Sequence, residues 1–287
     1  MMKIRLPYQP PYAWDRLIAF LAAREIPSIE TVTPECYSRT IRTEDAVSRI
    51  VVRNDESRNC LVVSIDPEPK GETDKILSRV RSMFDLDVDP NAVHALLTQD
   101  ELIAPFVHAR PGLRIPGIWD RFEFLIRAVL GQQVSVRSAT TTAARLVQLA
   151  GSRVSESADR ESHLFPEPEQ IASMDLLQLA VPGSRRRTIA VLAESIASGS
   201  LDLDDRDGRV QGLLSLPGIG PWTVEYALMR AFNEADAFPS GDLVLKKALR
   251  SDSDAPLPTS RQVEERAEAW RPWRAYATMY LWDSLLS

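Results

Sequence analysis

The chain has 287 residues, 44% of them hydrophobic, and a formal net charge of −6. This length suits one large domain or two to three small ones, with enough apolar residues for real cores. The negative charge argues against indiscriminate nucleic-acid binding but leaves local basic patches open. The longest apolar runs fall far short of the roughly 18 to 20 residues that a membrane-spanning helix requires. Two cysteines and three scattered histidines exclude a disulfide scaffold and argue against a zinc site.

Two further local features bear on location and metal binding. Met1–Pro7 contains no apolar core of a signal peptide, so a cytoplasmic location is expected. Four aspartates between residues 202 and 207 precede Gly208 as in a calcium loop, but the ligand positions do not align. This stretch is interpreted as a solvated acidic linker, and no metal site is expected.

The first ninety residues are predicted to form an α+β domain. A helix is expected over about 14–24, followed by two β-rich runs, 46–53 and 60–66, which a polar stretch joins as a hairpin. Between 74 and 84, apolar residues recur at helical spacing and predict a helix that covers the sheet. This domain is expected to end near Pro90.

The rest of the chain is typical of helices separated by proline and glycine, with no strand signal of comparable strength. The expected helical segments are 90–99, 118–133, 135–151, 168–180, 185–199, the stretch 216–249 and 260–282. The chain is therefore predicted to be an α+β cap on an all-α body.

Local charge departs from the overall balance in two places. Residues 105–150 contain six arginines against two acids, Asp120 and Glu123. Three consecutive arginines, 185–187, follow a Pro-Gly turn. By composition, these three arginines fit a solvated basic turn.

The stretch LPGIGPW at 216–222 predicts a tight turn between two helices. Gly218 and Gly220 leave little side-chain bulk around Ile219, and Pro221 suits the first position of a helix. Backbone N–H groups at a helix start, with the hydroxyl of Thr223, can bind a phosphate oxygen without reading the base sequence. Taken alone, the pattern fits an ordinary helix–helix turn equally well.

Asp242 follows the Pro- and Gly-rich stretch DAFPSG and opens the apolar, basic helix LVLKKAL. An aspartate in this place is by default an N-cap. Capping is compatible with chemistry, because a carboxylate held at a helix start is oriented and aimed outward.

The stretch 216–249 resembles the helix-hairpin-helix, Gly/Pro, Asp superfamily of DNA glycosylases, and within it the 3-methyladenine DNA glycosylase II (AlkA-type) family. Other segments look like the corresponding family segments: PPYAWDRLIAFLAARE at 10–25, ARPGLRIPG at 109–117, RAVLGQQVSV at 127–136 and WRPWRAYATMYLW at 270–282. The resemblance covers nearly the whole chain in the same order, which is more specific than the hairpin alone.

This resemblance implies a domain organisation. Residues 1–90 are expected to form an α+β domain with a TBP-like antiparallel sheet and helices. An all-α glycosylase core follows, in which 91–118 and 237–287 form a helical domain with the catalytic aspartate. Residues 119–236 form a second helical domain with the helix-hairpin-helix motif.

By resemblance, Asp242 is the essential carboxylate of a base-excision-repair enzyme. Such an enzyme flips alkylated purines of the 3-methyladenine type out of duplex DNA and hydrolyses their N-glycosidic bond, leaving an abasic site. A fixed anion favours the positively charged sugar of the transition state. Four aromatic residues match family pocket positions and could stack on cationic bases: Trp222, Tyr226, Trp282 and Phe20. Composition alone favours core packing for any one of them.

The sequence departs from the best-known family pattern at Gln133 and Leu243. Gln133 stands at the position of the DNA wedge, the side chain that fills the gap left by the flipped base, where a leucine is usual. A glutamine can hydrogen-bond to the unpaired partner base but makes less apolar contact than leucine. Leu243 replaces an aromatic residue beside the catalytic aspartate.

Trp222 stands where strand-nicking relatives carry a lysine nucleophile, so a monofunctional enzyme without a Schiff base is implied. The iron–sulfur cluster of some relatives needs four cysteines, and the C-terminal region has none.

The remaining expectations concern partners. By resemblance, Gly218, Ile219, Gly220 and Thr223 contact the DNA backbone. The stretch PGSRRRT lies where the family has another turn lining the binding cleft, and the resemblance implies a backbone contact for residues 185–187 as well. No cofactor is expected, although a monovalent cation at the hairpin carbonyls is compatible with the motif. The partner is double-stranded DNA with damaged bases, bound by a monomer, without a membrane, in a bacterial-type, nucleoid-associated cytoplasmic setting.

Two alternatives stay open. The first is a non-catalytic damaged-DNA-binding protein of the same fold. The second makes the N-terminal α+β unit a protein-interaction or regulatory domain on a structural helical body, and it predicts no salt-sensitive DNA affinity.

Overall fold

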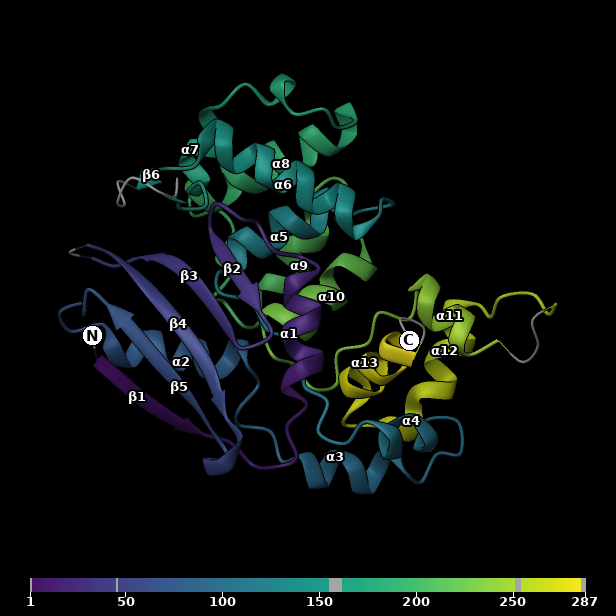
Figure 1. The fold of residues 1–287 in the computed structure, drawn as a ribbon. Coiled ribbons are helices and arrows are strands. Elements are labelled where there is room, and N and C mark those ends of the chain that lie inside the picture. Colours follow the sequence, from purple (N-terminus) through teal and green to yellow (C-terminus); the bar gives the residue numbers. More distant parts are fainter. Residues whose placement is uncertain (1, 45, 155–161, 251–253, 285–287) are drawn as a thin grey trace. The chain divides into compact units, whose positions relative to one another are not determined.

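The computed structural model describes residues 2–44, 46–154, 162–250 and 254–284 (Figure 1). The chain divides into two compact units, each built from separate segments. The first unit comprises Met1–Pro7, Ile18–Val80 and Trp119–Gly220; the second comprises Tyr8–Leu17, Arg81–Ile118 and Pro221–Ser287. The finer division into three domains, with boundaries near residues 90, 118 and 236, stays a prediction.

The first unit contains an antiparallel five-stranded sheet. Its strands are β1 (Met2–Pro7), β2 (Glu30–Thr33), β3 (Cys36–Arg42), β4 (Val47–Asp55) and β5 (Cys60–Asp66), in the order β1-β5-β4-β3-β2. The predicted hairpin is confirmed, because β4 and β5 pair with Ile50 opposite Ile65 and Val52 opposite Val63. These four side chains are buried and form a core face of the sheet.

Strand β3 shows why part of the sheet was not predicted. It buries five consecutive residues from Tyr37 to Ile41, and three of them are polar: Ser38, Arg39 and Thr40. The strand therefore lacks the alternation of a half-buried strand and the apolar run of a fully buried one. Strands β1 and β2 lie at the two edges of the sheet, and β2 has only four residues.

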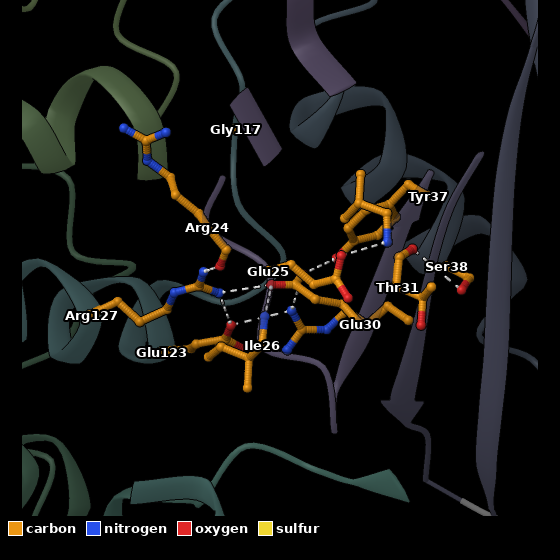
Figure 2. Close-up of polar contacts among 12 residues, drawn as sticks. Arg24, Glu25, Ile26, Glu30, Thr31, Tyr37, Ser38, Gly117, Glu123 and Arg127 are labelled. Atoms are coloured by element: carbon orange, nitrogen blue, oxygen red, sulfur yellow. Dashed lines mark hydrogen bonds and ion pairs between the residues drawn. The ribbon is translucent and has the colours of Figure 1, made fainter. Parts of the chain in front are cut away.

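An ionic network occupies the interior beside β3 (Figure 2). Arg39 forms a bidentate ion pair with Glu123 of α5 (Arg121–Leu130). One turn later on α5, Arg127 donates to Glu123 at 2.9 Å and to Glu30 at 3.2 Å. Tyr37 donates to Glu30 at 2.7 Å, so charge pairing joins β2, β3 and α5 within the first unit. Burial alone would raise the pKa of Glu123, but the guanidinium groups of Arg39 and Arg127 lower it below its ordinary value.

The N-terminal helices follow the prediction closely. Helix α1 (Trp14–Ala22) ends two residues before the expected position. Helix α2 (Thr73–Met83) confirms the helix expected at 74–84, and its Ile76 and Val80 are buried, as a helix that contributes to a core requires.

The helices of the first unit after α5 agree with the prediction except between 150 and 180. Helices α6 (Val136–Ala150) and α8 (Gly183–Ala197) end within two residues of expectation. The single helix predicted at 168–180 is wrong. Helix α7 (Pro168–Ser173) ends early, and Asp175 caps a separate 3-10 turn by accepting the N–H of Leu177. A small ribbon of β6 (Arg153–Val154) and β7 (Ser162–His163) was not predicted either.

The second unit is helical. Its helices are α3 (Pro90–Leu97), α4 (Ala104–Ala109), α10 (Pro221–Ala231), α11 (Leu243–Ala248), α12 (Ser260–Ala267) and α13 (Arg274–Ser284). The segment 260–282 is interrupted by a 3-10 turn, Glu268–Trp270, and by Pro272, which has no N–H to continue a helix. A sheet-containing N-terminal region and a helical body together confirm the predicted fold class. Within the described ranges, no helix has the length and apolar character needed to cross a membrane.

Candidate active site

Asp242 is the N-cap of helix α11, as the sequence predicts. Its backbone is extended, with φ −65° and ψ 131°, which turns the side chain back over the helix start. Oδ1 accepts the N–H groups of Val244 and Leu245 at 2.9 and 3.0 Å. The residue is only 9% exposed, so the carboxylate is held by protein groups more than by water. The positive end of the helix dipole also favours an anion at this position.

Two tryptophans add hydrogen bonds to the same carboxylate. Trp222, in the first turn of α10, donates Nε1–H to Oδ2 of Asp242 at 3.0 Å, and Trp282 of α13 donates Nε1–H to Oδ1 at 3.1 Å. An indole N–H is only a donor, so both contacts require the oxygens of Asp242 to act as acceptors. The sequence indicated these residues as pocket aromatics but not as partners of Asp242, because they lie 20 and 40 residues away.

Three of the four predicted pocket aromatics lie together and form what is called the aromatic cluster below: Trp222, Tyr226 and Trp282. Trp222 and Tyr226 stack with ring centroids 5.1 Å apart and an interplanar angle of 26°. Tyr226 meets Trp282 edge to face at 5.9 Å and 66°. All three are half-buried, so the cluster is partly accessible beside Asp242.

A buried arginine that the sequence analysis missed supports this cluster. Arg230, one turn after Tyr226 on α10, donates to the Tyr226 hydroxyl at 2.7 Å. Its other nitrogens donate to the carbonyls of Pro116 at 2.7 Å and Gly117 at 3.2 Å. The i, i+4, i+8 spacing of residues 222, 226 and 230 was the signal available in the sequence. Arg230 thereby links α10 to the segment ARPGLRIPG.

The loop that leads to Asp242 is held by Glu225 on α10. Glu225 accepts the backbone N–H of Phe238 at 2.8 Å, and the N–H of Asp242 donates to the carbonyl of Pro239 at 2.8 Å. Burial raises the pKa of Glu225. The Pro- and Gly-rich approach to Asp242 therefore follows a path set by hydrogen bonds.

The hairpin has the predicted boundaries, because α9 (Arg209–Ser215) ends just before it and α10 begins at Pro221. Gly218 has φ +81°, and a Cβ at this position would lie 2.2 Å from Oγ1 of Thr188 on α8. Both features require glycine. A Cβ at Gly220 would meet nothing within 4 Å.

The other hairpin positions are less accessible than the sequence indicates. Ile219 is buried, and its N–H donates to the carbonyl of Leu216 at 3.2 Å. Thr223 is also buried. Contact of Gly218, Ile219, Gly220 and Thr223 with a DNA phosphate stays a prediction.

Gln133 and Phe20 belong to the first unit, whereas Asp242 and the aromatic cluster belong to the second. Gln133 is exposed in the loop between α5 and α6, with φ +57°, a region that residues with a side chain rarely adopt. Phe20 is half-buried, and the guanidinium of Arg24 lies 3.5 Å from its ring centroid. The assignments of Gln133 as wedge and Phe20 as pocket residue stay predictions. Leu243, next to Asp242, is exposed.

Most arginines of residues 105–150 have hydrogen-bond or ion-pair partners within the protein. Buried Arg114 donates to the carbonyls of Gln9 and Pro11, Arg127 lies in the ionic network, and Arg110 and Arg121 pair with Asp283 and Asp204. Arg137 and Arg145 are exposed. Counting charges along the sequence therefore overstated the basic surface of this segment.

The three arginines that follow the Pro-Gly turn also have different surroundings. Arg185 donates to the carbonyl of Gln132, and Arg186 donates to that of Val181. Arg187 is exposed on α8. The sequence treats these residues as one cluster, but the structure gives two of them internal contacts.

The structure places no group of three or more His, Cys, Asp or Glu side chains where they could hold a metal ion, as far as the described residues extend. In the acidic stretch before α9, the side chains of Asp202 and Asp205 accept nearby backbone N–H groups. These carboxylates therefore organise a turn.

Comparison with known proteins agrees with this geometry. The AlkA N-terminal domain model matches residues 3–120, and the model of the HhH-GPD superfamily base excision DNA repair protein matches residues 126–272. A probable bifunctional transcriptional activator/DNA repair enzyme AlkA of Mycobacterium tuberculosis is 39% identical over 99% of this chain, which spans only 57% of that relative. DNA-3-methyladenine glycosylase 2 of Escherichia coli is 33% identical, over 96% of this chain and 95% of that protein. The solved 3-methyladenine DNA-glycosylase from Archaeoglobus fulgidus shares the fold, with a TM-score of 0.84 at 22% identity over 99% of both chains.

Proposed function

The chain belongs to the HhH-GPD superfamily of base excision DNA repair proteins, and on this basis we propose that it is a monofunctional DNA glycosylase. The proposed reaction flips an alkylated purine of the 3-methyladenine type out of duplex DNA and hydrolyses its N-glycosidic bond, leaving an abasic site. The environment of Asp242 carries this proposal. Its carboxylate is oriented by the start of α11 and by two indole N–H groups of the aromatic cluster.

Asp242 is suited to act as a fixed anion. Cleavage of the N-glycosidic bond develops positive charge on the sugar, which a nearby carboxylate stabilises more than the neutral ground state. Among the described residues, Oδ1 accepts three hydrogen bonds and Oδ2 accepts one. Because a carboxylate oxygen has two lone pairs, the attacking water is expected to approach Oδ2.

The aromatic cluster supplies the proposed base pocket. Methylation at N3 or N7 gives a purine positive charge, and stacking such a base on electron-rich rings contributes about 0.5 to 2 kcal/mol. Trp222 occupies the position of the lysine nucleophile in strand-nicking relatives, and here its N–H contacts Asp242. Without an amine at this position no Schiff base forms, so borohydride is expected to trap no covalent DNA adduct.

The proposed partner is double-stranded DNA with a damaged base, bound by a monomer in the cytoplasm at the nucleoid. The hairpin contacts the backbone, and Gln133 fills the gap that the flipped base leaves. The reaction requires no cofactor. A monovalent cation at the hairpin would share the Gly218 carbonyl with the side-chain amide of Gln132, which donates to it at 2.9 Å.

Release of free base from methylated duplex DNA tests this proposal. Asp242→Asn removes the charge, and because asparagine is also a good N-cap, α11 is expected to persist. Wild type is expected to release base and the variant to lose about 100-fold or more in rate. Asp204→Asn is a matched control, since Asp204 pairs with Arg121 at the surface of the first unit. Tight binding without release by wild type, over a panel of lesions, would instead favour a non-catalytic DNA-binding protein.

A further inference from the structure

The loop that carries Gln133 is held in a conformation that its sequence does not favour. Gln133 is exposed and has φ +57°, where a residue with a Cβ is strained. Such a conformation persists only when its surroundings determine it. The contacts of the neighbouring residues therefore show how the loop is held.

The residue before Gln133 is fixed on two sides. The side chain of Gln132 donates Nε2–H to the carbonyl of Gly218 in the hairpin at 2.9 Å. The backbone carbonyl of Gln132 accepts a hydrogen bond from the guanidinium of Arg185 on α8. These two contacts restrain the side chain of Gln132 and the peptide bond that joins Gln132 to Gln133.

Helix α8 holds the loop and the hairpin through one face. Arg185 and Thr188 are three residues apart, which places them on the same side of the helix. Arg185 contacts the loop at Gln132, and Thr188 lies against Gly218, where it leaves no room for a Cβ. The hairpin and the Gln133 loop are therefore fixed to each other and to a common support within the first unit.

The start of the loop is also anchored. The N–H of Gly131 donates to the carbonyl of Arg127 at 2.9 Å, at the end of α5. The Arg127 side chain lies in the buried ionic network with Glu123 and Glu30, and it also donates to the carbonyl of Arg24 (Figure 2). The last turn of α5 therefore offers a rigid origin for the loop.

We propose that Gln132 and Arg185 are positioning residues that pre-form the Gln133 wedge and couple it to the hairpin. This inference rests on the proposed function of Gln133. When the hairpin binds a DNA phosphate, Gln133 is then already positioned to enter the base stack, and its loop does not have to become ordered first. Arg185 acts through the protein backbone, which distinguishes it from a phosphate contact.

The exposed neighbour Arg187 provides a matched control, because Arg185→Gln and Arg187→Gln remove the same charge from the same helix. The probe is a duplex that carries a tetrahydrofuran abasic analogue opposite 2-aminopurine, whose fluorescence rises when a wedge unstacks it. This readout does not require base release. Melting temperatures and near-UV circular dichroism verify that each variant is folded.

Arg185→Gln and Gln132→Ala are expected to reduce the fluorescence change at saturating protein about fivefold, because unstacking takes a few kcal/mol that a disordered wedge does not supply. Arg187→Gln is expected to keep the full change and to reduce the slope of log affinity against log salt by about one. In the double variant Arg185→Gln/Gln132→Ala, the fluorescence change is expected to fall no further than in the more impaired of the two single variants, because both residues act on one loop.

Base release separates the two proposals. Arg185→Gln is expected to slow release about tenfold from a paired lesion and less than about twofold from a lesion opposite an abasic site, where little pairing opposes flipping. If Arg185→Gln behaves like Arg187→Gln, with a full fluorescence change and a reduced salt slope, Arg185 is a phosphate contact and the inference is wrong. If wild type gives the fluorescence change but releases no base, the glycosylase proposal fails and the positioning role stands.

Discussion

The indole Nε1 of Trp282 donates a hydrogen bond to Oδ1 of Asp242 at 3.1 Å, across 40 residues of sequence. The same side chain packs edge to face against Tyr226. One residue therefore contributes both to the aromatic cluster and to the orientation of the carboxylate. Because Trp282 makes both contacts, a single substitution that keeps the ring and removes the N–H can show which of them matters for activity.

Trp282→Phe keeps an aromatic ring and removes the donor to Asp242. A hydrogen bond to a charged group contributes about 1.5 to 3 kcal/mol, so kcat for base release is expected to fall about tenfold with little change in KM. Tyr226→Phe is the control, because the Tyr226 hydroxyl bonds to Arg230 and its ring is kept. A raised KM with unchanged kcat in Trp282→Phe would mean that Trp282 acts by stacking alone.

Arg230→Gln tests the support beneath the aromatic cluster. Arg230 donates hydrogen bonds to the carbonyls of Pro116 and Gly117 and to the Tyr226 hydroxyl, and the substitution removes these bonds. Each buried polar group left unpaired costs about 1 to 3 kcal/mol, so the melting temperature is expected to fall by ~5 °C or more. Arg261→Gln, which removes an exposed arginine, is expected to change stability by less than about 0.5 kcal/mol. Equal melting temperatures of both variants would contradict the supporting role of Arg230.

Gly218→Ala tests the geometry of the hairpin. Alanine must adopt φ +81° and place its Cβ against Oγ1 of Thr188. A destabilisation of about 1 to 3 kcal/mol is expected in urea unfolding, together with weaker DNA binding. Gly220→Ala is the matched control, because its Cβ meets nothing within 4 Å. Adding Thr188→Ala to Gly218→Ala should recover only the steric part of the loss, since the backbone strain remains.

Glu123→Gln tests the ionic network through its dependence on pH. The pKa of Glu123 is lowered in the folded state, so its ionised form stabilises the protein above its ordinary value of 4.5, and this contribution is lost as pH falls through the lowered pKa. At pH 7 the variant is expected to lose about 3 kcal/mol, because Arg39 and Arg127 lose a buried partner. The difference between variant and wild type should shrink in acid.

Urea unfolding midpoints at pH 7, 5, 4 and 3 measure this convergence. Glu265→Gln is the control, because its pair with Arg261 is exposed and contributes about 0.5 kcal/mol at most. A difference between wild type and Glu123→Gln that stays constant from pH 7 to pH 3 would contradict the lowered pKa.

Local sequence patterns predicted much of the molecule. The hairpin of β4 and β5, the ends of α6 and α8 and the boundaries of the helix-hairpin-helix turn were all expected. Their signals lie within a few residues of one another, as alternation, helical periodicity, glycine and proline. The helical pattern at 168–180 predicted one helix. In the structure, a side-chain cap at Asp175 starts a separate 3-10 turn within this stretch.

Strand β3 and the arginines mark the limit of such patterns. Ser38, Arg39 and Thr40 are buried in β3, and Arg39 is stable there because Glu123, 84 residues later, pairs with it. By count, residues 105–150 form a basic segment. In the folded protein, however, most of these arginines contact acidic side chains or backbone carbonyls. Charge along a sequence does not distinguish a surface patch from a set of internal pairs.

The sequence by itself determined the cap at Asp242, the glycine turn before α10 and the family to which the chain belongs, because each depends on residues close together or in a fixed order. Only the tertiary structure decided that Trp222 and Trp282 both orient Asp242, and that Arg185 supports the Gln133 loop. These contacts join residues 20 to 53 positions apart. Their partners are selected by packing of whole helices, and no local propensity encodes that packing.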